Sequence, residues 1–141
     1  MDWLLALFIT LATGGYDVQE HLCVTTTIYG EAAGESYLGK WAVGQVIANR
    51  MADPRWPETA CAVVQQRRQF AGYRTPRLRN AIDQRAWEES SRVAYHVLTG
   101  QPSLLPECAA ADHFDRIRDT PSWARRLRQV CDIEGHTFYG H

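Results

Sequence analysis

The clearest periodic pattern of apolar residues lies between residues 36 and 54. Two neighbouring rows repeat every four residues, as on one face of an α-helix: Leu38, Ala42 and Val46, and Val43, Ile47 and Met51. Ser36 is a suitable N-cap for this helix, and Asp53-Pro54 is a suitable end. We therefore predict an amphipathic helix over this stretch, with Asn49 and Arg50 on its polar side.

A second helix is predicted to begin after Asp17. Asp17 followed three residues later by Glu20 forms a capping box, in which each side chain accepts a hydrogen bond from the other residue's backbone N–H. The helix should run to about Ala33 and stop at Gly34. Threonines at residues 25–27 weaken its intrinsic propensity, so tertiary packing must hold it.

Two more helices are expected downstream. A short one should cover residues 57–66 with Pro57 in its first turn, and a long one should cover residues 83–99 and stop at Gly100. The residues expected to face inward are Cys61 and Val64 in the short helix, and Trp87, Ala94, Val97 and Leu98 in the long one.

The last third of the chain changes character. Residues 109–114 should form an extended segment and residues 121–130 a short helix. Short strands are expected at residues 131–133 and 136–139, around a turn at Gly135. The predicted fold class is α+β, mainly α, with a small β element near the C-terminus.

Residues 3–12 form an apolar run that is too short to span a bilayer. Asp2 precedes it, and it lacks the positively charged start of a secretory signal. We predict a buried first helix that is capped by Asp2 and stopped by Gly14-Gly15. The alternative is an export or membrane-docking segment.

The composition is that of one soluble domain spanning residues 1–141. Apolar residues make up 45% of the chain and charged residues 22%, with a net charge of −1. This balance gives no reason to expect a nucleic-acid partner. Arginines cluster at residues 67–68, 74–85 and 116–128, either as solvated helix faces or as a surface that attracts an anionic polymer such as cell wall.

Four cysteines show no C-x-x-C spacing, so a structural zinc site is not expected. Three pairings are open, and one or two disulfides are as compatible with the sequence as isolated buried thiols. The four are Cys23, Cys61, Cys108 and Cys131.

Glu31 is the strongest candidate for a catalytic group. It falls in the last turn of its predicted helix, where unpaired carbonyls disfavour a second negative charge. We expect partial burial by Tyr29 and small neighbours to disfavour ionisation further. A carboxyl group that stays protonated near neutral pH can donate its proton to a departing glycosidic oxygen. The alternative is an exposed glutamate at a frayed helix end.

Other polar and aromatic residues suit a sugar-binding groove. Glu35 is either a second carboxylate or, as we prefer, a charge that favours the start of the next helix. His113 and His136 lack the spacing of a metal motif, so no metal and no cofactor are expected. The predicted substrate-binding residues are Glu35, Gln45, Asn49, Gln69, Phe70, Tyr73, His113, Phe114, His136 and Tyr139.

Five blocks in this order resemble the SleB/CwlJ family of cell wall hydrolases, which is known from spore-cortex lysis and from phage-encoded enzymes. The resemblance covers residues 24–139. The blocks are Ile28-Tyr29-Gly30-Glu31-Ala32-Ala33-Gly34-Glu35-Ser36 with Gly39, Ala42-Val43, Val46 and Asn49-Arg50; Trp56-Pro57 with Cys61-Ala62-Val63-Val64-Gln65 and Gln69-Phe70; His113-Phe114; Pro121-Ser122-Trp123-Ala124; and Gly135-His136-Thr137-Phe138-Tyr139.

The resemblance implies a lysozyme-like, mainly helical catalytic domain whose general acid is Glu31. It also implies lytic transglycosylase chemistry on the MurNAc–GlcNAc β-1,4 bond, in which the sugar's own C6 hydroxyl forms a 1,6-anhydro product. One carboxyl group then serves as acid and later as base. Two departures fall near the expected cleft: Asp115 replaces the second histidine of a His-aromatic-His element, and Glu134 replaces a glycine.

The expected partner is therefore the peptidoglycan glycan strand, for a monomer that acts in the periplasm or cell wall without stable membrane insertion. Virion or lysis proteins are further candidate partners, since a phage-encoded enzyme needs a delivery route. Two other functions stay open. One is a metal-dependent wall amidase or peptidase that uses His113 and His136, with Asp112, Asp115 or Cys131 as further ligands. The other is a non-catalytic wall-binding or virion component.

Overall fold

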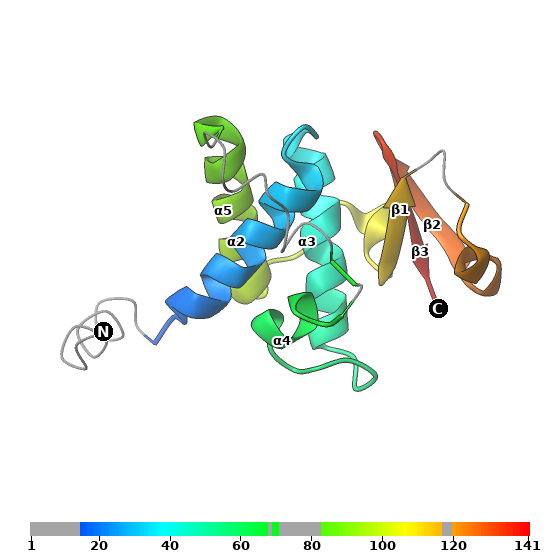
Figure 1. Ribbon diagram of the computed structural model, residues 1–141, viewed down its shortest axis with the longest axis horizontal. Helices are drawn as coiled ribbons and strands as arrows, with labels where there is room; N and C mark the ends of the chain where they lie inside the picture. The colour runs from blue at the N-terminus through cyan, green and yellow to red at the C-terminus, as the bar shows by residue number, and fades with distance from the viewer. Residues whose placement is uncertain (1–14, 68, 71–82, 117–119) are drawn as a thin grey trace.

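The computed structural model describes residues 15–67, 69–70, 83–116 and 120–141. Within them, four helices precede three strands: α2 (Val18–Ala32), α3 (Tyr37–Met51), α4 (Ala60–Val64), α5 (Gln84–Leu98), β1 (His113–Arg116), β2 (Arg128–Ile133) and β3 (His136–Gly140). Figure 1 shows α2 and α5 at one end, the sheet at the other, and α3 between them. The mainly helical α+β prediction is confirmed. The predicted helix at residues 3–12 lies outside the described residues.

Three predicted helix starts are confirmed by their caps. Asp17 accepts hydrogen bonds from the backbone N–H groups of Gln19 and Glu20, and Ser36 and Asp83 cap α3 and α5 in the same way. The capping box is only half formed. Glu20 does not reach back to Asp17; its Oε2 accepts from the backbone N–H of Cys61 at 2.9 Å and so links α2 to α4.

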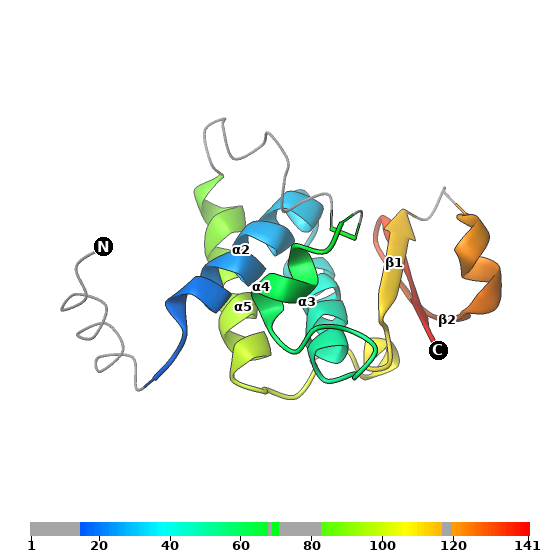
Figure 2. The same cartoon turned by 60° about the horizontal axis from the view of Figure 1, so that its bottom comes forward.

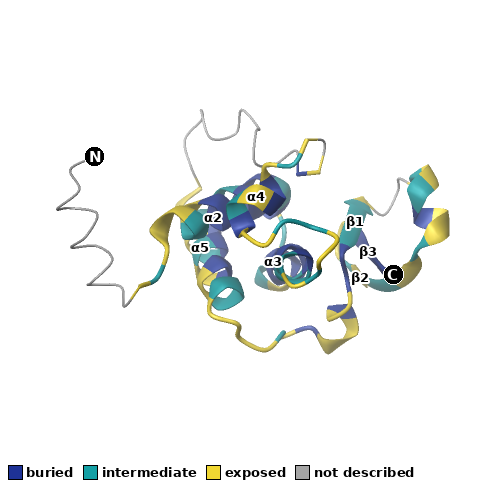
Figure 3. Cartoon of the chain, turned by 90° about the horizontal axis from the view of Figure 1, so that it is seen from below, coloured by how far each residue is buried: buried dark blue, intermediate teal, exposed yellow. Residues whose placement is uncertain are grey.

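Helix α3 is the centre of the core, and Figure 3 shows it almost end-on with its surface largely buried. Ala42, Val43, Val46 and Ile47 are fully buried, as the periodic pattern predicts. Leu38 is the first residue of one predicted apolar row but is 46% exposed, so the row is buried only from Ala42 onward. Leu38 lies in the first turn of α3.

Helices α3 and α5 approach closely at Gly44. A Cβ atom on Gly44 would lie 2.7 Å from Cγ1 of Val93, so only glycine fits here. Helix α5 ends near Gly100, whose φ is +70°, as expected for a glycine stop. Of the four residues predicted to face inward from α5, Ala94 is buried, whereas Trp87, Val97 and Leu98 are half-buried. The other buried residues of this helix are Ala86, Ser90 and Val93.

The strands form an antiparallel sheet in the order β1-β3-β2. All five residues of β3 are buried. The helix predicted over residues 121–130 is wrong: a 3-10 turn covers Ser122–Arg126, and β2 begins at Arg128 because β3 supplies backbone partners there. The extended segment predicted from residue 109 becomes a strand only at His113. Helix α4 is shorter than predicted, because Thr59 rather than Pro57 marks its start.

All four cysteines are paired. One disulfide joins Cys23 of α2 to Cys61 of α4, and the other joins Cys108 to Cys131 of β2. Both link segments that are distant in sequence, and together they brace the helical part and the sheet. None of the described helices has the combination of length and apolar character that a membrane crossing requires.

Candidate active site

A cleft of about 890 Å³ lies between the helices and the sheet. Figure 2 shows the parts that surround it: the C-terminal end of α2, the segment after α4, and β1. The residues that line it are Glu31, Arg50, Gln66, Arg67, Gln69, Phe70, His113, Phe114, Asp115, Arg116, Trp123 and His136. Six of the sequence-predicted site residues therefore share one cleft: Glu31, Gln69, Phe70, His113, Phe114 and His136.

Glu31 is half-buried in the last turn of α2, as expected. The Tyr29 ring packs against Trp87 of α5 with 5.5 Å between centroids, and its hydroxyl accepts from the backbone N–H of Asp83 at 3.0 Å. Residues two apart on a helix do not face each other, so the burial of Glu31 by Tyr29 stays a prediction.

Aromatic rings form one wall of the cleft. Phe114 of β1 lies 6.0 Å from Phe70 and 5.4 Å from His136, measured between ring centroids. Phe114 also stacks on Phe138, its partner in the strand register. Sugar rings pack on such apolar faces while their hydroxyls reach polar groups nearby.

Arg50 supplies a buried positive charge at the cleft. It is 3% exposed, and its Nε donates to the backbone oxygen of Asp112 at 2.8 Å while Nη1 donates to Oε1 of Gln69 at 3.0 Å. Its guanidinium lies over the rings of Trp56 and Phe70, 5.2 and 5.1 Å from their centroids. Burial lowers the pKa of Arg50 to about 10, so it stays charged at neutral pH.

Sequence analysis missed the role of Arg50 and Trp123. Arg50 was placed on the polar side of its helix, and no local pattern distinguishes a solvated arginine from one that a later strand covers. Trp123 was part of the family resemblance but not of the predicted site. In the structure Trp123 lines the cleft and packs against Tyr139, with 5.3 Å between ring centroids.

Three other predicted residues fall elsewhere. Asn49 Nδ2 donates to the backbone oxygens of Ala109 and Ala111, and Gln45 donates to Asn49 Oδ1 at 2.9 Å, so this amide pair braces the loop before β1. Neither lines the cleft, because later chain covers this helix face. Tyr139 is buried behind Trp123, and Tyr73 lies outside the described residues.

Glu35 sits beside the cleft rather than in its lining. Its Oε1 lies 3.4 Å from Nδ1 of His136, which does line the cleft. A hydrogen bond with Glu134, then burial and the like charge of Glu134, raise the pKa of Glu35. Hydrogen bonds from Glu35 and Ser36 lower the pKa of Glu134 to about 2. Glu134 holds φ at +50°, a backbone conformation that favours glycine.

His113 does not pair with His136. Its Nδ1 lies 2.7 Å from Oδ1 of Asp112, whose Oδ2 is 2.6 Å from Nδ1 of His141. Burial is the largest influence on Asp112 and raises its pKa, but the hydrogen bonds with the two histidines outweigh it, so the net shift is downward. The ligand set predicted for a metal-dependent enzyme, His113 with His136, is therefore not assembled.

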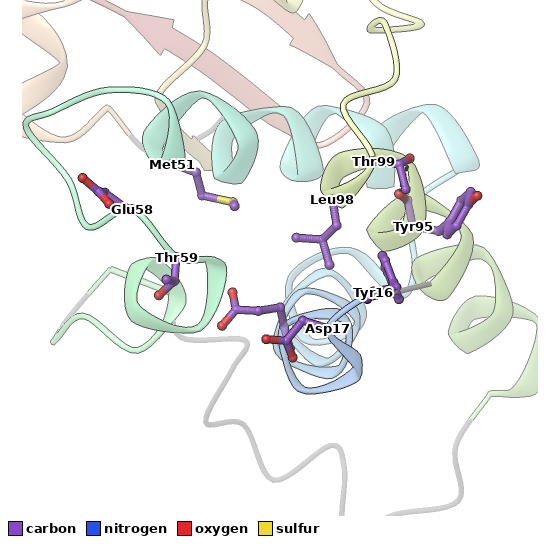
Figure 4. A pocket seen from close by; sticks show the side chains of 10 residues that line it. Tyr16, Asp17, Met51, Glu58, Thr59, Tyr95, Leu98 and Thr99 are labelled. Carbon is purple, nitrogen blue, oxygen red and sulfur yellow. Dashed lines mark hydrogen bonds between the residues drawn. The ribbon is translucent and has the colours of Figure 1, made fainter. Parts of the chain in front are cut away.

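A second cavity of about 580 Å³ lies among the ends of the helices, away from Glu31 (Figure 4). It contains three carboxylates, but two of them have structural partners. Asp17 caps α2, and Glu20 accepts from Cys61. The larger cleft, which holds Glu31, is therefore the better candidate for catalysis.

The family profile described as Cell Wall Hydrolase matches residues 34–139. The chain belongs to the cell wall hydrolase family. This confirms the resemblance to SleB/CwlJ proteins. The matched region begins three residues after Glu31, so the match itself does not address the catalytic residue.

Individual relatives agree with the family assignment. A spore cortex-lytic enzyme from Bacillus cereus is 36% identical over 135 residues, covering 92% of this chain and 47% of that protein. A spore cortex-lytic enzyme from Halalkalibacterium halodurans is 28% identical over 129 residues, covering 92% of this chain and 37% of that protein. The chain thus spans less than half the length of these relatives.

Solved structures share the fold. The crystal structure of the catalytic domain of the Bacillus cereus SleB protein matches with a TM-score of 0.71 and 24% identity, covering 89% of this chain and 92% of that one. The catalytic domain of germination-specific lytic transglycosylase SleB from Bacillus anthracis matches with a TM-score of 0.67 and 26% identity, covering 89% of this chain and 97% of that one. The SleB-like fold follows from these matches.

Proposed function

We propose that this protein cleaves peptidoglycan glycan strands at MurNAc–GlcNAc β-1,4 bonds as a lytic transglycosylase, with Glu31 as general acid and base. The observation that carries this proposal is the position of Glu31 in the wall of the large cleft, in a chain that belongs to the cell wall hydrolase family. Aromatic rings and polar groups in the same cleft suit a sugar chain. The Bacillus anthracis structure, which shares the fold, is described as a lytic transglycosylase.

In this mechanism the Glu31 carboxylic acid donates its proton to the glycosidic oxygen as the bond to C1 breaks. Positive charge develops at C1, and the resulting Glu31 carboxylate then accepts the proton of the C6 hydroxyl. The C6 oxygen bonds to C1 and forms the 1,6-anhydro ring. One carboxyl group is therefore enough, because Glu31 regains from the C6 hydroxyl the proton that it gave to the glycosidic oxygen.

The cleft also favours a second candidate reaction, hydrolysis. Asp115 lines the same cleft as Glu31, so two carboxyl groups face the space that the substrate would occupy. A second carboxylate can activate a water molecule or form a covalent intermediate, and either route gives a reducing end instead of an anhydro end. The products therefore distinguish the two reactions.

The test is digestion of purified peptidoglycan followed by mass spectrometry of the glycan fragments. Wild-type protein should release fragments with anhydro-MurNAc ends, and Glu31→Gln should abolish release while keeping the wild-type melting temperature. Glu58→Gln is the matched control, because Glu58 belongs to the second cavity and should keep full activity. Full activity of Glu31→Gln would contradict the proposal, and reducing ends that disappear in Asp115→Asn would establish hydrolysis.

We propose the cell wall as the place of action and its glycan strands as the partner of a monomeric chain. Virion and lysis proteins are further candidate partners, because the family resemblance includes phage-encoded enzymes. A non-catalytic wall-binding role would give glycan binding without fragments in the same digestion. A wall amidase or peptidase would release stem peptides and leave the glycan chains uncut.

A further inference from the structure

Two histidines flank one buried aspartate at the edge of the cleft. Asp112 is 5% exposed and is followed directly by His113, while His141 reaches it from beyond the end of β3. Each oxygen of the Asp112 carboxylate faces a different imidazole Nδ1, at 2.7 and 2.6 Å. Among the described residues, these three side chains place their ligand atoms within 4.8 Å of one another.

We propose that Asp112, His113 and His141 form a binding site for a divalent transition metal of the zinc class. Imidazole nitrogen and carboxylate oxygen are the donors that zinc accepts, together with cysteine sulfur. The ion would take the place of the two N–H protons between the imidazoles and the carboxylate, and each imidazole would then carry its proton on Nε2. Two nitrogens and one or two oxygens would then bind it, and a further position would stay open.

The surroundings hold the two imidazoles in place. The Trp56 ring lies edge-on to both, with centroids 5.9 Å from His113 and 6.0 Å from His141. Trp123 packs on His113 from the cleft side, 5.2 Å between centroids. The register of β1 against β3 holds His113 opposite Tyr139, two residues before His141, so the sheet itself brings the ligands together. Outer contacts of this kind orient metal ligands.

Two cations oppose metal binding. Arg50 is buried and donates to the backbone oxygen of Asp112, so it stays beside the site. Arg55 Nη2 lies 3.5 Å from Oδ2 of Asp112, and it would repel an incoming ion. The main partner of Arg55 is Asp53, at 2.6 Å, and the Arg55 side chain is 49% exposed. It can therefore turn toward solvent when an ion enters. Removing Arg55 should tighten metal binding, whereas a purely hydrogen-bonded cluster predicts no such gain.

The test uses the full chain without a histidine tag, titrated with Zn²⁺ in a calorimeter and with Co²⁺ in an absorption spectrometer. Wild type should bind one Zn²⁺ per chain, and Co²⁺ should give the intense visible bands of a site with four or five ligands. His141→Ala should weaken binding at least tenfold, and Arg55→Ala should strengthen it several-fold. His136→Gln, the other cleft histidine, is the matched control and should bind as wild type does.

The His141 side chain is 42% exposed, so its removal should leave the fold intact and the result interpretable. Absence of saturable binding, equal affinity in His141→Ala, or loss of binding in His136→Gln would each overturn the proposal. Binding is measured without substrate, so failure here leaves the proposed glycan cleavage untouched, and failure of Glu31→Gln leaves this site untouched.

Discussion

Lys40 of α3 and Glu89 of α5 form an ion pair inside the protein, with 3.3 Å between Nζ and Oε2. The Lys40 side chain is 2% exposed and that of Glu89 is 18% exposed. The Lys40 ammonium also donates to the backbone oxygens of Ala33 and Glu35, at 3.5 and 2.5 Å. The pair therefore joins two helices to the loop that directly follows Glu31.

Replacing Lys40 by Met should destabilise the protein by about 2–4 kcal/mol, because Glu89 and the loop carbonyls would lose their buried cation. Urea unfolding monitored by circular dichroism measures this change. Arg85→Gln is the matched control: Arg85 binds the other oxygen of Glu89 at 3.1 Å but its side chain is 88% exposed. Its loss should cost less than about 1 kcal/mol. Equal effects of the two substitutions would contradict a special role for the buried pair.

The Cys23–Cys61 disulfide should contribute about 4 kcal/mol, since it closes a loop with a sequence separation of 38 residues. We expect Cys23→Ala/Cys61→Ala to lower the melting temperature by roughly 10 °C for a chain of this size. Calorimetry with and without a reducing agent checks this, and reduction should affect the double variant less than wild type. Free thiols in the unreduced wild-type protein would contradict the observed pairing.

Arg50→Lys should not behave as a conservative substitution. A lysine cannot bind Asp112 and Gln69 together while lying between Trp56 and Phe70. We expect a loss of about 2 kcal/mol in the free energy of unfolding, together with reduced glycan cleavage. Arg67→Lys is the control, since Arg67 is an exposed residue of the same cleft and should change stability by less than about 0.5 kcal/mol.

The Glu35–Glu134 pair should make stability depend on pH. The native pKa of Glu35 is raised, so its contribution is present at low pH and is lost as pH rises through that value. The native pKa of Glu134 is about 2, so its contribution is present above its ordinary pKa and is lost as pH falls toward 2. Lys40 and His136 also face Glu35 and enter the same equilibrium.

Glu134→Gln should therefore bring the pKa of Glu35 down toward its ordinary value, as measured by carbon-13 NMR of the side-chain carboxyl. Wild type should lose stability relative to this variant as pH rises from about 4.5, the ordinary glutamate value, through the raised pKa of Glu35, because only wild type retains the extra proton there. Parallel stability curves for the two proteins would show that the carboxyl groups titrate independently.

Local chemistry explains most of what could be predicted about the helices. Asp17, Ser36 and Asp83 mark helix starts because each cap bond spans only two or three residues. Glu31 could be singled out because its place in the last turn of α2 is also a local property. The helix predicted at residues 121–130 does not form, and the reason is not local. Strand β2 forms there through hydrogen bonds to β3, and a short stretch of sequence around Arg128 does not include that partner.

The sequence by itself determined where α2, α3 and α5 begin, the family and the candidate acid, since each depends on neighbours within a few residues or on motif order. Only the tertiary structure decided which cysteines pair, that Lys40 and Arg50 are buried, and that Asn49 braces the loop before β1. Asn49 and Ala111, for example, are 62 residues apart. Such contacts form between surfaces that exist only once the chain has folded, so local pattern carries no signal for them.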